Sequence, residues 1–185
     1  MCYLGVDRTI FHPSTVASHG EHILHISNDE PRKNVDRIVA AYQSLQPTIG
    51  QPLLLKLPVD RFRQEAGDIR VITNRLSDEG IARLYRKAAV LVFPSLYEGF
   101  GLPVIEAQAN GVPVICSDIP VFHEVAADSA AFLNKDASAA DMHAIISNKD
   151  LRDSLIRKGK ENVSRYSWKK LSAQMMTIYQ QQLIK

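Results

Sequence analysis

The sequence has few cysteines and no long hydrophobic run. Two cysteines occur in 185 residues, Cys2 and Cys116, far apart in the chain. They cannot form the disulfide framework of a small secreted scaffold, and Cys116, within the apolar run VPVICS, is expected to be a reduced, buried thiol. No apolar stretch approaches the roughly 20 residues of a membrane-spanning helix, and MCYLGVDRTIFHP at the N-terminus contains no hydrophobic signal region. We therefore expect a cytoplasmic protein.

The chain also lacks an excess of charge of either sign. Lys and Arg number 22 against 20 Asp and Glu, a formal net charge of +2, which gives no reason to expect nucleic acid as a partner. Basic residues are nevertheless enriched towards the C-terminus. They are Arg152, Arg157, Lys158, Lys160, Arg165, Lys169 and Lys170. A solvated helix face and a patch that faces a membrane surface both explain this enrichment, so peripheral membrane association stays open.

Six short apolar runs alternate with helical patterns after residue 20. The runs cover residues 22–26, 52–57, 69–72, 90–95, 112–117 and 130–133. Strands that are apolar on both faces and are separated by helices predict a parallel sheet covered on both sides. The expected fold class is α/β, a Rossmann-like, doubly wound parallel sheet. Three further helical segments are expected near residues 138–148, 150–164 and 167–183.

Two of the connecting helices are clear from their spacing. Residues 32–45 place apolar side chains at helical intervals, and Ser77 can cap a helix that carries Ile81, Leu84 and Tyr85. In an open sheet of this kind, ligands bind where the carboxyl ends of the strands meet the following loops and helix starts. We therefore look for chemistry at the strand ends.

The most informative stretch is PSLYEGFGLPVIEAQANGVPVICSD, residues 94–118. A buried strand ends there, a loop with Gly99 and Gly101 follows, and Pro103 is expected in the first turn of a short helix that stops at Asn110 and Gly111. The two glycines allow a tight turn and close approach of a ligand to the backbone. Free amides and the dipole at the helix start can hold an anion such as a phosphate.

Two glutamates flank this turn. Glu98 lies in the loop and Glu106 is expected in the first turn of the helix, so both carboxylates can face one crevice and accept hydroxyl protons of a ribose or a sugar. A purely structural explanation of this pattern, without any ligand, is equally open. Any turn from a strand into a helix can use glycine twice, and a glutamate near a helix start interacts favourably with the helix dipole. Position 104 is not glycine, so the dinucleotide fingerprint is incomplete, and no Gly-Lys-Ser/Thr phosphate loop occurs.

The histidines do not predict a metal site. His22 and His25 fall on opposite faces of their strand, so they cannot share an ion, and we expect no bound metal. His123 precedes Glu124 close to a strand end, where a contact to phosphate and a surface or capping role are both open.

Glu98, seven intervening residues and Glu106, within YEGFGLPVIEA and followed by GVPVICSD, resemble the donor-site motif of retaining glycosyltransferases with the GT-B fold. The family is glycosyltransferase family four, or group 1, which includes bacterial mannosyl- and glucosyltransferases. GVDRTIFHP is similar to the family's interdomain linker, NDEPRKN to its phosphate-binding loop, and SDIPVFHEVA and YSWKKLSAQMMTIY to segments after the motif. The resemblance implies that residues 1–20 are a linker and 21–185 the donor-binding, C-terminal domain. It also implies that the N-terminal, acceptor-binding domain is absent from this chain.

The resemblance assigns roles to residues of the motif. Glu98 would contact hydroxyls of the donor sugar, and Glu106 would hold the ribose. The backbone amides that would contact the sugar and the diphosphate belong to Gly99, Phe100, Gly101 and Leu102.

Outside the motif, Lys33 would bind the diphosphate and stabilise the charge that builds on the leaving group, which makes Glu98 and Lys33 the expected catalytic pair. Many members have Gly-Arg just after the first strand, where this chain has Ser27-Asn28, so Arg32 is the candidate for a second cation. The base is expected near Arg75 and Leu76.

The implied reaction transfers a sugar from a GDP- or UDP-sugar, with no further cofactor, to a saccharide or lipid-linked acceptor held by the missing domain. Surface polysaccharide or glycoconjugate synthesis is the expected setting, and SDIPVFHEVA, which is similar to mannosyltransferase members, favours GDP-mannose. Two alternatives remain. One is a non-catalytic nucleotide-binding or partner-binding module, because the family's catalytic histidine region lies in the other domain; the other is a sugar-nucleotide epimerase or phosphorylase of related fold.

Overall fold

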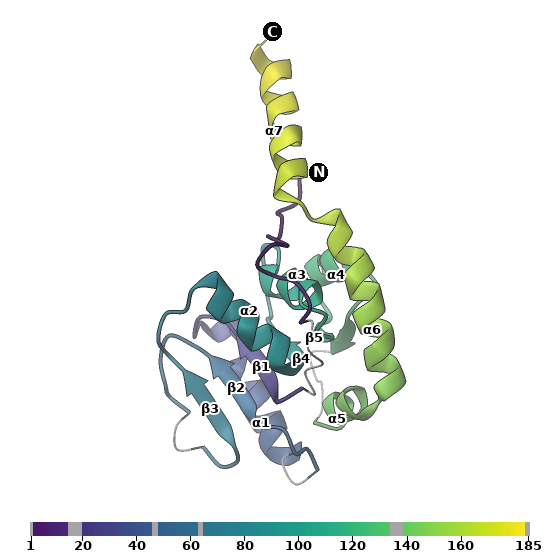
Figure 1. Ribbon diagram of the computed structural model, residues 1–185. Helices are drawn as coiled ribbons and strands as arrows, with labels where there is room; N and C mark the ends of the chain where they lie inside the picture. Colours follow the sequence, from purple (N-terminus) through teal and green to yellow (C-terminus); the bar gives the residue numbers. More distant parts are fainter. Residues whose placement is uncertain (1, 15–19, 46–47, 63–64, 134–138, 184–185) are drawn as a thin grey trace.

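A computed structural model describes residues 2–14, 20–45, 48–62, 65–133 and 139–183 (Figure 1). Its centre is a six-stranded sheet in the order β3-β2-β1-β4-β5-β6, and every neighbouring pair is parallel. The strands are β1 (His22–Ile26), β2 (Leu53–Lys56), β3 (Ile69–Ile72), β4 (Ala88–Phe93), β5 (Val114–Ser117) and β6 (Ala131–Leu133). The predicted α/β, Rossmann-like, doubly wound sheet is confirmed.

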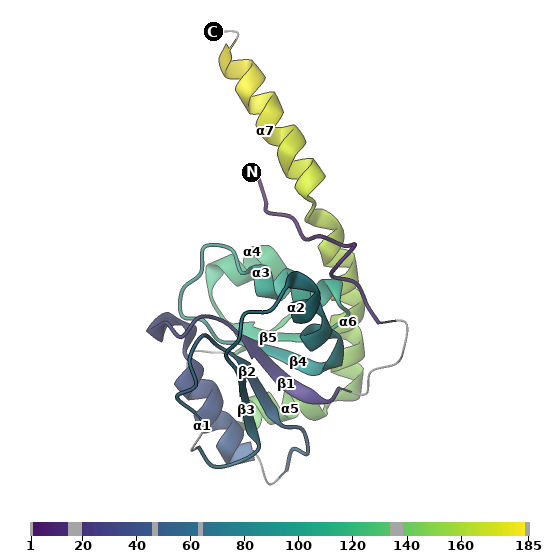
Figure 2. The same ribbon diagram turned by 60° about the vertical axis from the view of Figure 1, so that its left-hand side comes forward.

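Helices cover both faces of the sheet (Figures 1 and 2). The helical segments are η1 (Pro31–Lys33), α1 (Val35–Leu45), α2 (Asp78–Lys87), α3 (Leu102–Ala109), α4 (Pro120–Ala126), α5 (Ala139–Ser147), α6 (Lys149–Asn162), η2 (Val163–Arg165) and α7 (Trp168–Leu183). Helices α1 and α5 pack on one face, whereas α2, α3 and α4 pack on the other, with α6 against α3. The three expected C-terminal helices are α5, α6 and α7.

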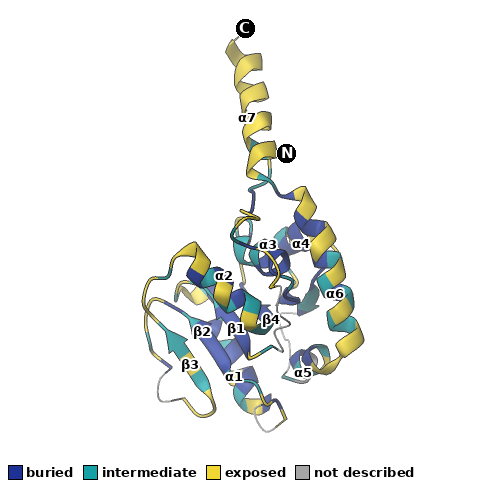
Figure 3. Cartoon of the chain, in the orientation of Figure 1, coloured by how far each residue is buried: buried dark blue, intermediate teal, exposed yellow. Residues whose placement is uncertain are grey.

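Neighbouring side chains of one strand point to opposite cores. In β1, Ile23 joins the core beneath α1 and α5, whereas Leu24 joins the core beneath α2, α3 and α4. In β4, Val92 and Phe93 divide in the same way. Because successive side chains of a strand alternate between faces, these runs must be apolar throughout to bury both sides of the sheet. Figure 3 shows the central strands as the most deeply buried part of the chain.

Three local features differ from expectation. The helix predicted from residue 32 begins at Val35, because Pro31 starts a 3-10 turn and Asn34 turns the chain with φ of +58°. The predicted strand 90–95 runs from 88 to 93 and ends before Pro94, which has no amide hydrogen to continue the ladder. Helix α4, between β5 and β6, was not predicted. By contrast, Ser77 caps α2 as expected, since its hydroxyl accepts from the Gly80 amide.

The N-terminal segment lies against the domain. Val6 and Phe11 are buried, Phe11 packs edge-on against Tyr85 at 6.3 Å, and Gly5 lies so close to Trp168 that a Cβ there would overlap its backbone nitrogen. The N-terminus lies near the start of α7, which extends away from the body (Figures 1 and 2) and has no buried residue. That residues 1–20 form an interdomain linker, with a donor-binding domain at 21–185, stays a prediction.

A buried polar network joins α3 to α6. The Gln108 amide donates to Ser129 Oγ at 2.8 Å, and the Asn162 amide donates to Gln108 Oε1 at 2.8 Å and to the Val125 carbonyl at 2.9 Å. All three side chains are buried. Because buried polar groups are costly unless paired, the network fixes how α3 lies on the domain.

We expect Asn162→Ala to lower the free energy of unfolding by about 1–3 kcal/mol, because Gln108 Oε1 loses its buried donor. Urea denaturation followed by circular dichroism would measure the loss. Lys160→Ala, at an exposed position of the same helix, is the matched control and should change stability by less than about 0.5 kcal/mol. Equal effects of the two substitutions would contradict a stabilising role for the network.

Candidate functional site

The site is built from the loops that follow β1 and β4. These two strands are neighbours in the sheet, but the chain leaves β1 towards β2 on one side and β4 towards β5 on the other. A switch of this kind opens a crevice at the carboxyl ends of the strands. The loops are tied together by the Leu96 amide, which donates to the Arg32 carbonyl at 2.8 Å, and by Asn34 Nδ2, which donates to the Pro94 carbonyl at 3.4 Å.

The structure brings Glu98, Lys33 and Arg32 together. Lys33 Nζ lies 2.5 Å from Glu98 Oε1, and Arg32 Nη1 lies 3.2 Å from Glu98 Oε2. The Lys33 and Glu98 side chains are 10% and 9% exposed, whereas Arg32 is 37% exposed and also pairs with Glu30. One carboxylate is thus held between two cations, one enclosed and one reaching solvent. Because the Lys33 side chain is buried, it does not belong to a solvated helical turn.

The floor of the site keeps Lys33 in place. The Lys33 ammonium lies 5.3 Å from the centroid of the Phe93 ring. The fully buried His25 ring stacks on the same Phe93 ring, with the two ring centroids 5.9 Å apart. Burial, helped by the nearby Lys33 charge and opposed by the hydrogen bond to the Val92 carbonyl, lowers the pKa of His25 to about 4, so this histidine is neutral. Its Nδ1 donates to the Val92 carbonyl at 2.9 Å, and its Nε2 lies 2.7 Å from Ser27 Oγ.

The start of α3 depends on one glycine. Gly101 has φ of +98°, and a Cβ at this position would lie 2.6 Å from Phe122 Cε1. At Gly99 an added Cβ would meet nothing within 4 Å, so the space beside this residue is open. The Phe100 ring packs against Tyr3 and Tyr166. In the first turn of α3, Pro103 has no amide hydrogen and the Val104 amide donates to the Gly101 carbonyl at 2.9 Å, which leaves the Leu102 amide as the candidate donor of this turn.

Glu106 lies in the second turn of α3, so its predicted place in the first turn is wrong. The offset arises because the helix begins only at Leu102, after the left-handed Gly101. Tyr85 donates its hydroxyl to Glu106 Oε2 at 3.0 Å. Burial raises the pKa of Glu106, and the Tyr85 hydrogen bond opposes that shift. Glu98 and Glu106 therefore have separate partners. The expectation that both carboxylates face one crevice stays a prediction.

The predicted base-binding residues lie at the same edge of the sheet, between β3 and α2. Arg75 is exposed and Leu76 is half-buried. No hydrogen bond or ion pair found in the described part of the chain links either of them to Lys33, Glu98 or Glu106, so their role stays a prediction. His123 is exposed at the surface, and a contact to phosphate stays a prediction. Its Nε2 lies 2.5 Å from Asp118 Oδ1 and its ring stacks on Phe132 at 4.2 Å.

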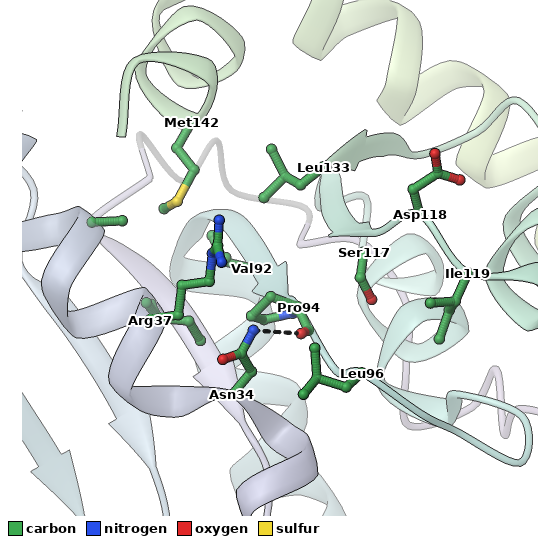
Figure 4. A pocket seen from close by; sticks show the side chains of 12 residues that line it. Asn34, Arg37, Val92, Pro94, Leu96, Ser117, Asp118, Ile119, Leu133 and Met142 are labelled. Carbon is green, nitrogen blue, oxygen red and sulfur yellow. Dashed lines mark hydrogen bonds between the residues drawn. The ribbon is translucent and has the colours of Figure 1, made fainter. Parts of the chain in front are cut away.

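A separate cavity of about 230 Å³ lies on the α1 and α5 side of the carboxyl edge (Figure 4). Its walls are mainly apolar, and none of the ten predicted site residues lines it. Residues that line it include Ile38, Val92, Leu96, Ile119, Leu133 and Met142.

In the described ranges, no three side chains of His, Cys, Asp or Glu gather as a metal site would require. No helix in those ranges is long and apolar enough to cross a membrane.

Residues 65–162 match the family model described as Glycosyl transferases group 1. The chain belongs to this family. It is 33% identical over 172 residues to the O-antigen chain mannosyltransferase B of Escherichia coli, covering 84% of this chain and 45% of that protein. It is 31% identical over 192 residues to an MMP alpha-(1->4)-mannosyltransferase of Mycolicibacterium hassiacum, covering 96% and 47%. The chain thus spans about half the length of these relatives.

The fold is shared with a solved domain of the group 1 family. The C-terminal domain of a group 1 glycosyl transferase, LpcC, from Francisella tularensis superposes with a TM-score of 0.72 at 20% identity, covering 87% of this chain and 97% of that one. In architecture, this group 1 chain therefore corresponds to a C-terminal domain of the GT-B fold, as the motif resemblance implied.

Two supporting residues were missed from the sequence. Tyr85 was assigned only to the apolar face of α2, although its hydroxyl holds Glu106, and His25 was considered only as a metal ligand. Their partners lie 21 and 67 residues away in the chain. No short-range pattern could reveal such pairs; the one available signal was a polar atom on an otherwise apolar face.

We expect Tyr85→Phe to raise the pKa of Glu106 further, because the hydrogen bond that lowers it is lost. A group whose pKa is raised by folding binds its proton more tightly in the native state. Its contribution to stability therefore falls as pH increases from the ordinary glutamate range through the raised pKa. Titration of the carboxyl carbon by NMR would measure the shift. Tyr179→Phe, on exposed α7, should leave it unchanged, and an unchanged pKa in Tyr85→Phe would contradict the assignment.

Proposed function

We propose that this chain is the donor-binding domain of a retaining glycosyltransferase and that it binds a nucleoside diphosphate sugar at the carboxyl ends of β1 and β4. The observation that carries the proposal is Glu98, held between Lys33 and Arg32 beside the glycine-bearing start of α3. A carboxylate that can accept sugar hydroxyls thus lies next to cations that can hold a diphosphate.

The diphosphate would take over part of the cations' hydrogen bonding from Glu98. Arg32, the more exposed cation, can contact two phosphate oxygens at once, and Lys33 supplies a buried positive charge. When the glycosidic bond to phosphate breaks, negative charge builds on the leaving diphosphate. Fixed cations and the helix start stabilise that charge, which lowers the barrier to transfer. Glu98, partly released, would accept hydroxyls of the donor sugar.

Glu106 would hold the ribose through one defined oxygen. Tyr85 donates to Oε2, so Oε1 is the atom that we assign to a ribose hydroxyl. Arg75 and Leu76, in the loop after β3, are assigned to the base, and the amides from Gly99 to Leu102 to the sugar and diphosphate.

The acceptor and the complete reaction belong to a longer protein in this proposal. Because the chain spans about half of its curated relatives, we infer that a saccharide or lipid-linked acceptor is held by a further, N-terminal domain. Both relatives are named mannosyltransferases, one of them for the O-antigen chain, which supports a mannosyl donor, GDP-mannose, and a role in surface polysaccharide synthesis. A cytoplasmic location with peripheral membrane association is part of the same proposal.

Calorimetric titration of the 185-residue chain with GDP, UDP, GDP-mannose and UDP-glucose would test donor binding. We expect a GDP compound to bind and Lys33→Met to weaken diphosphate binding by about 10- to 100-fold, since one charge-assisted contact is lost. Glu106→Ala should weaken binding of the nucleoside as well as of the nucleotide. Glu98→Gln should reduce the advantage of GDP-mannose over GDP.

Lys87→Met is the matched control, because Lys87 is exposed and pairs only with Glu21 among the described residues. It should bind as the unmodified chain does. If none of the four compounds binds, or if Lys33→Met matches the control, the proposed function is wrong. Binding without transfer after the rest of the protein is restored would favour the non-catalytic module.

A further inference from the structure

One arginine outside the donor site holds the loop that carries the two cations. Arg61 lies in the loop after β2, and its guanidinium contacts two carboxylates at once. Its Nε lies 2.9 and 2.7 Å from the two oxygens of Asp29. Its Nη1 and Nη2 lie 2.5 and 2.9 Å from the two oxygens of Asp36. We call this group of three side chains the Arg61 clamp.

The two carboxylates stand on either side of the cation-bearing turn. Asp29 precedes η1, which contains Arg32 and Lys33, and Asp36 lies in the first turn of α1 just after it. The clamp therefore joins both ends of residues 29–36 to the loop after β2. On the other side, the same segment is tied to the loop after β4 through the Arg32 carbonyl. The turn is thus held from two directions.

The clamp itself is anchored to the core. The Arg61 guanidinium lies 4.2 Å from the centroid of the Phe62 ring, and Phe62 is buried. The Asp29 side chain is only 16% exposed, so its position is restricted as well. Stacking on an aromatic ring and bidentate pairing both use the planar shape of a guanidinium, which the ammonium of lysine cannot reproduce.

The clamp differs from an isolated surface ion pair. An isolated exposed pair contributes little to folding, typically below about 1 kcal/mol, whereas bidentate pairs that form a network contribute more. Arg70 and Asp68 show the ordinary case: they lie two residues apart and connect no separate elements. The Arg61 clamp instead links the loop after β2 to the loop after β1 and to α1. Without it, Asp29 and Asp36 are two like charges at the ends of a short turn, and their repulsion favours other loop conformations.

We propose that Arg61 is a positioning residue for diphosphate recognition: it does not touch the donor, but it fixes the turn so that Arg32 and Lys33 meet the diphosphate without reorganisation. The inference rests on the proposed function, because it assumes that these cations bind a diphosphate. A binding group that is already in place loses less conformational freedom when its ligand arrives. The benefit of the clamp should thus appear in contacts to phosphate, not in contacts to the base and ribose.

The test compares Arg61→Met with the unmodified chain. Methionine keeps an unbranched stem over Phe62 but removes the guanidinium. Chemical-shift titration by NMR, which also detects weak binding, would measure the affinities for GDP and guanosine, and for UDP and uridine. We expect Arg61→Met to weaken diphosphate binding by about 10-fold and nucleoside binding by less than about 2-fold. Arg61→Lys should recover part of the loss, because an ammonium restores the charge but not the two bidentate pairs.

Amide hydrogen exchange gives a second measurement without any ligand. We expect faster exchange at residues 29–36 in Arg61→Met and unchanged exchange at the buried strands. Arg70→Met, which removes an arginine paired with a single aspartate, is the matched control and should change neither binding nor exchange at residues 29–36.

The outcomes separate this inference from the proposed function. If the unmodified chain binds GDP or UDP and Arg61→Met binds it equally well, the positioning role is overturned and the proposed function stands. An equal loss of nucleoside and diphosphate binding also overturns it, because it shows a general structural effect. If the unmodified chain binds no diphosphate at all, the proposed function fails, and the inference that rests on it fails with it.

Discussion

The ion pair between Lys33 and Glu98 is the interaction on which the site depends. Both side chains are about nine-tenths enclosed, where a lone charge would be strongly unfavourable. Each therefore requires the other while no ligand is bound, and the pair draws the loops after β1 and β4 together. In the proposed function, a ligand would have to offer an anion to Lys33 and hydroxyl donors to Glu98 to replace both sides of this pair.

Arg32 also contacts Glu98, but the buried ring beneath the pair adds no further charge. His25, directly beneath, is neutral because it is fully buried, and its ring nitrogens are taken up by the Val92 carbonyl and Ser27. Glu106, the second carboxylate of the motif, is held apart by Tyr85 on α2. Glu98, held from η1, and Glu106, held from α2, thus have separate surroundings.

The sheet and the glycine-bearing helix start could be predicted from the sequence because both depend on local patterns. Two-sided apolar runs indicate buried parallel strands, and Gly101 followed by Pro103 indicates a turn into a helix. The Arg61 clamp and the Tyr85 contact could not be predicted, because each joins residues that only the folded sheet brings together. The start of α1 was misplaced for a different reason: helical periodicity continues through Arg32, whereas the left-handed backbone of Asn34 has no signal in apolar spacing.

The contact between Gly101 and Phe122 couples parts of the molecule that are described separately above. The Phe122 ring occupies the space beside Gly101 and also packs against Phe93, at 5.8 Å, on whose ring Lys33 lies. A single aromatic side chain from α4 therefore supports both the helix start and the cation. A change at Phe122 would therefore alter the surroundings of Gly101 and the support beneath Lys33 together.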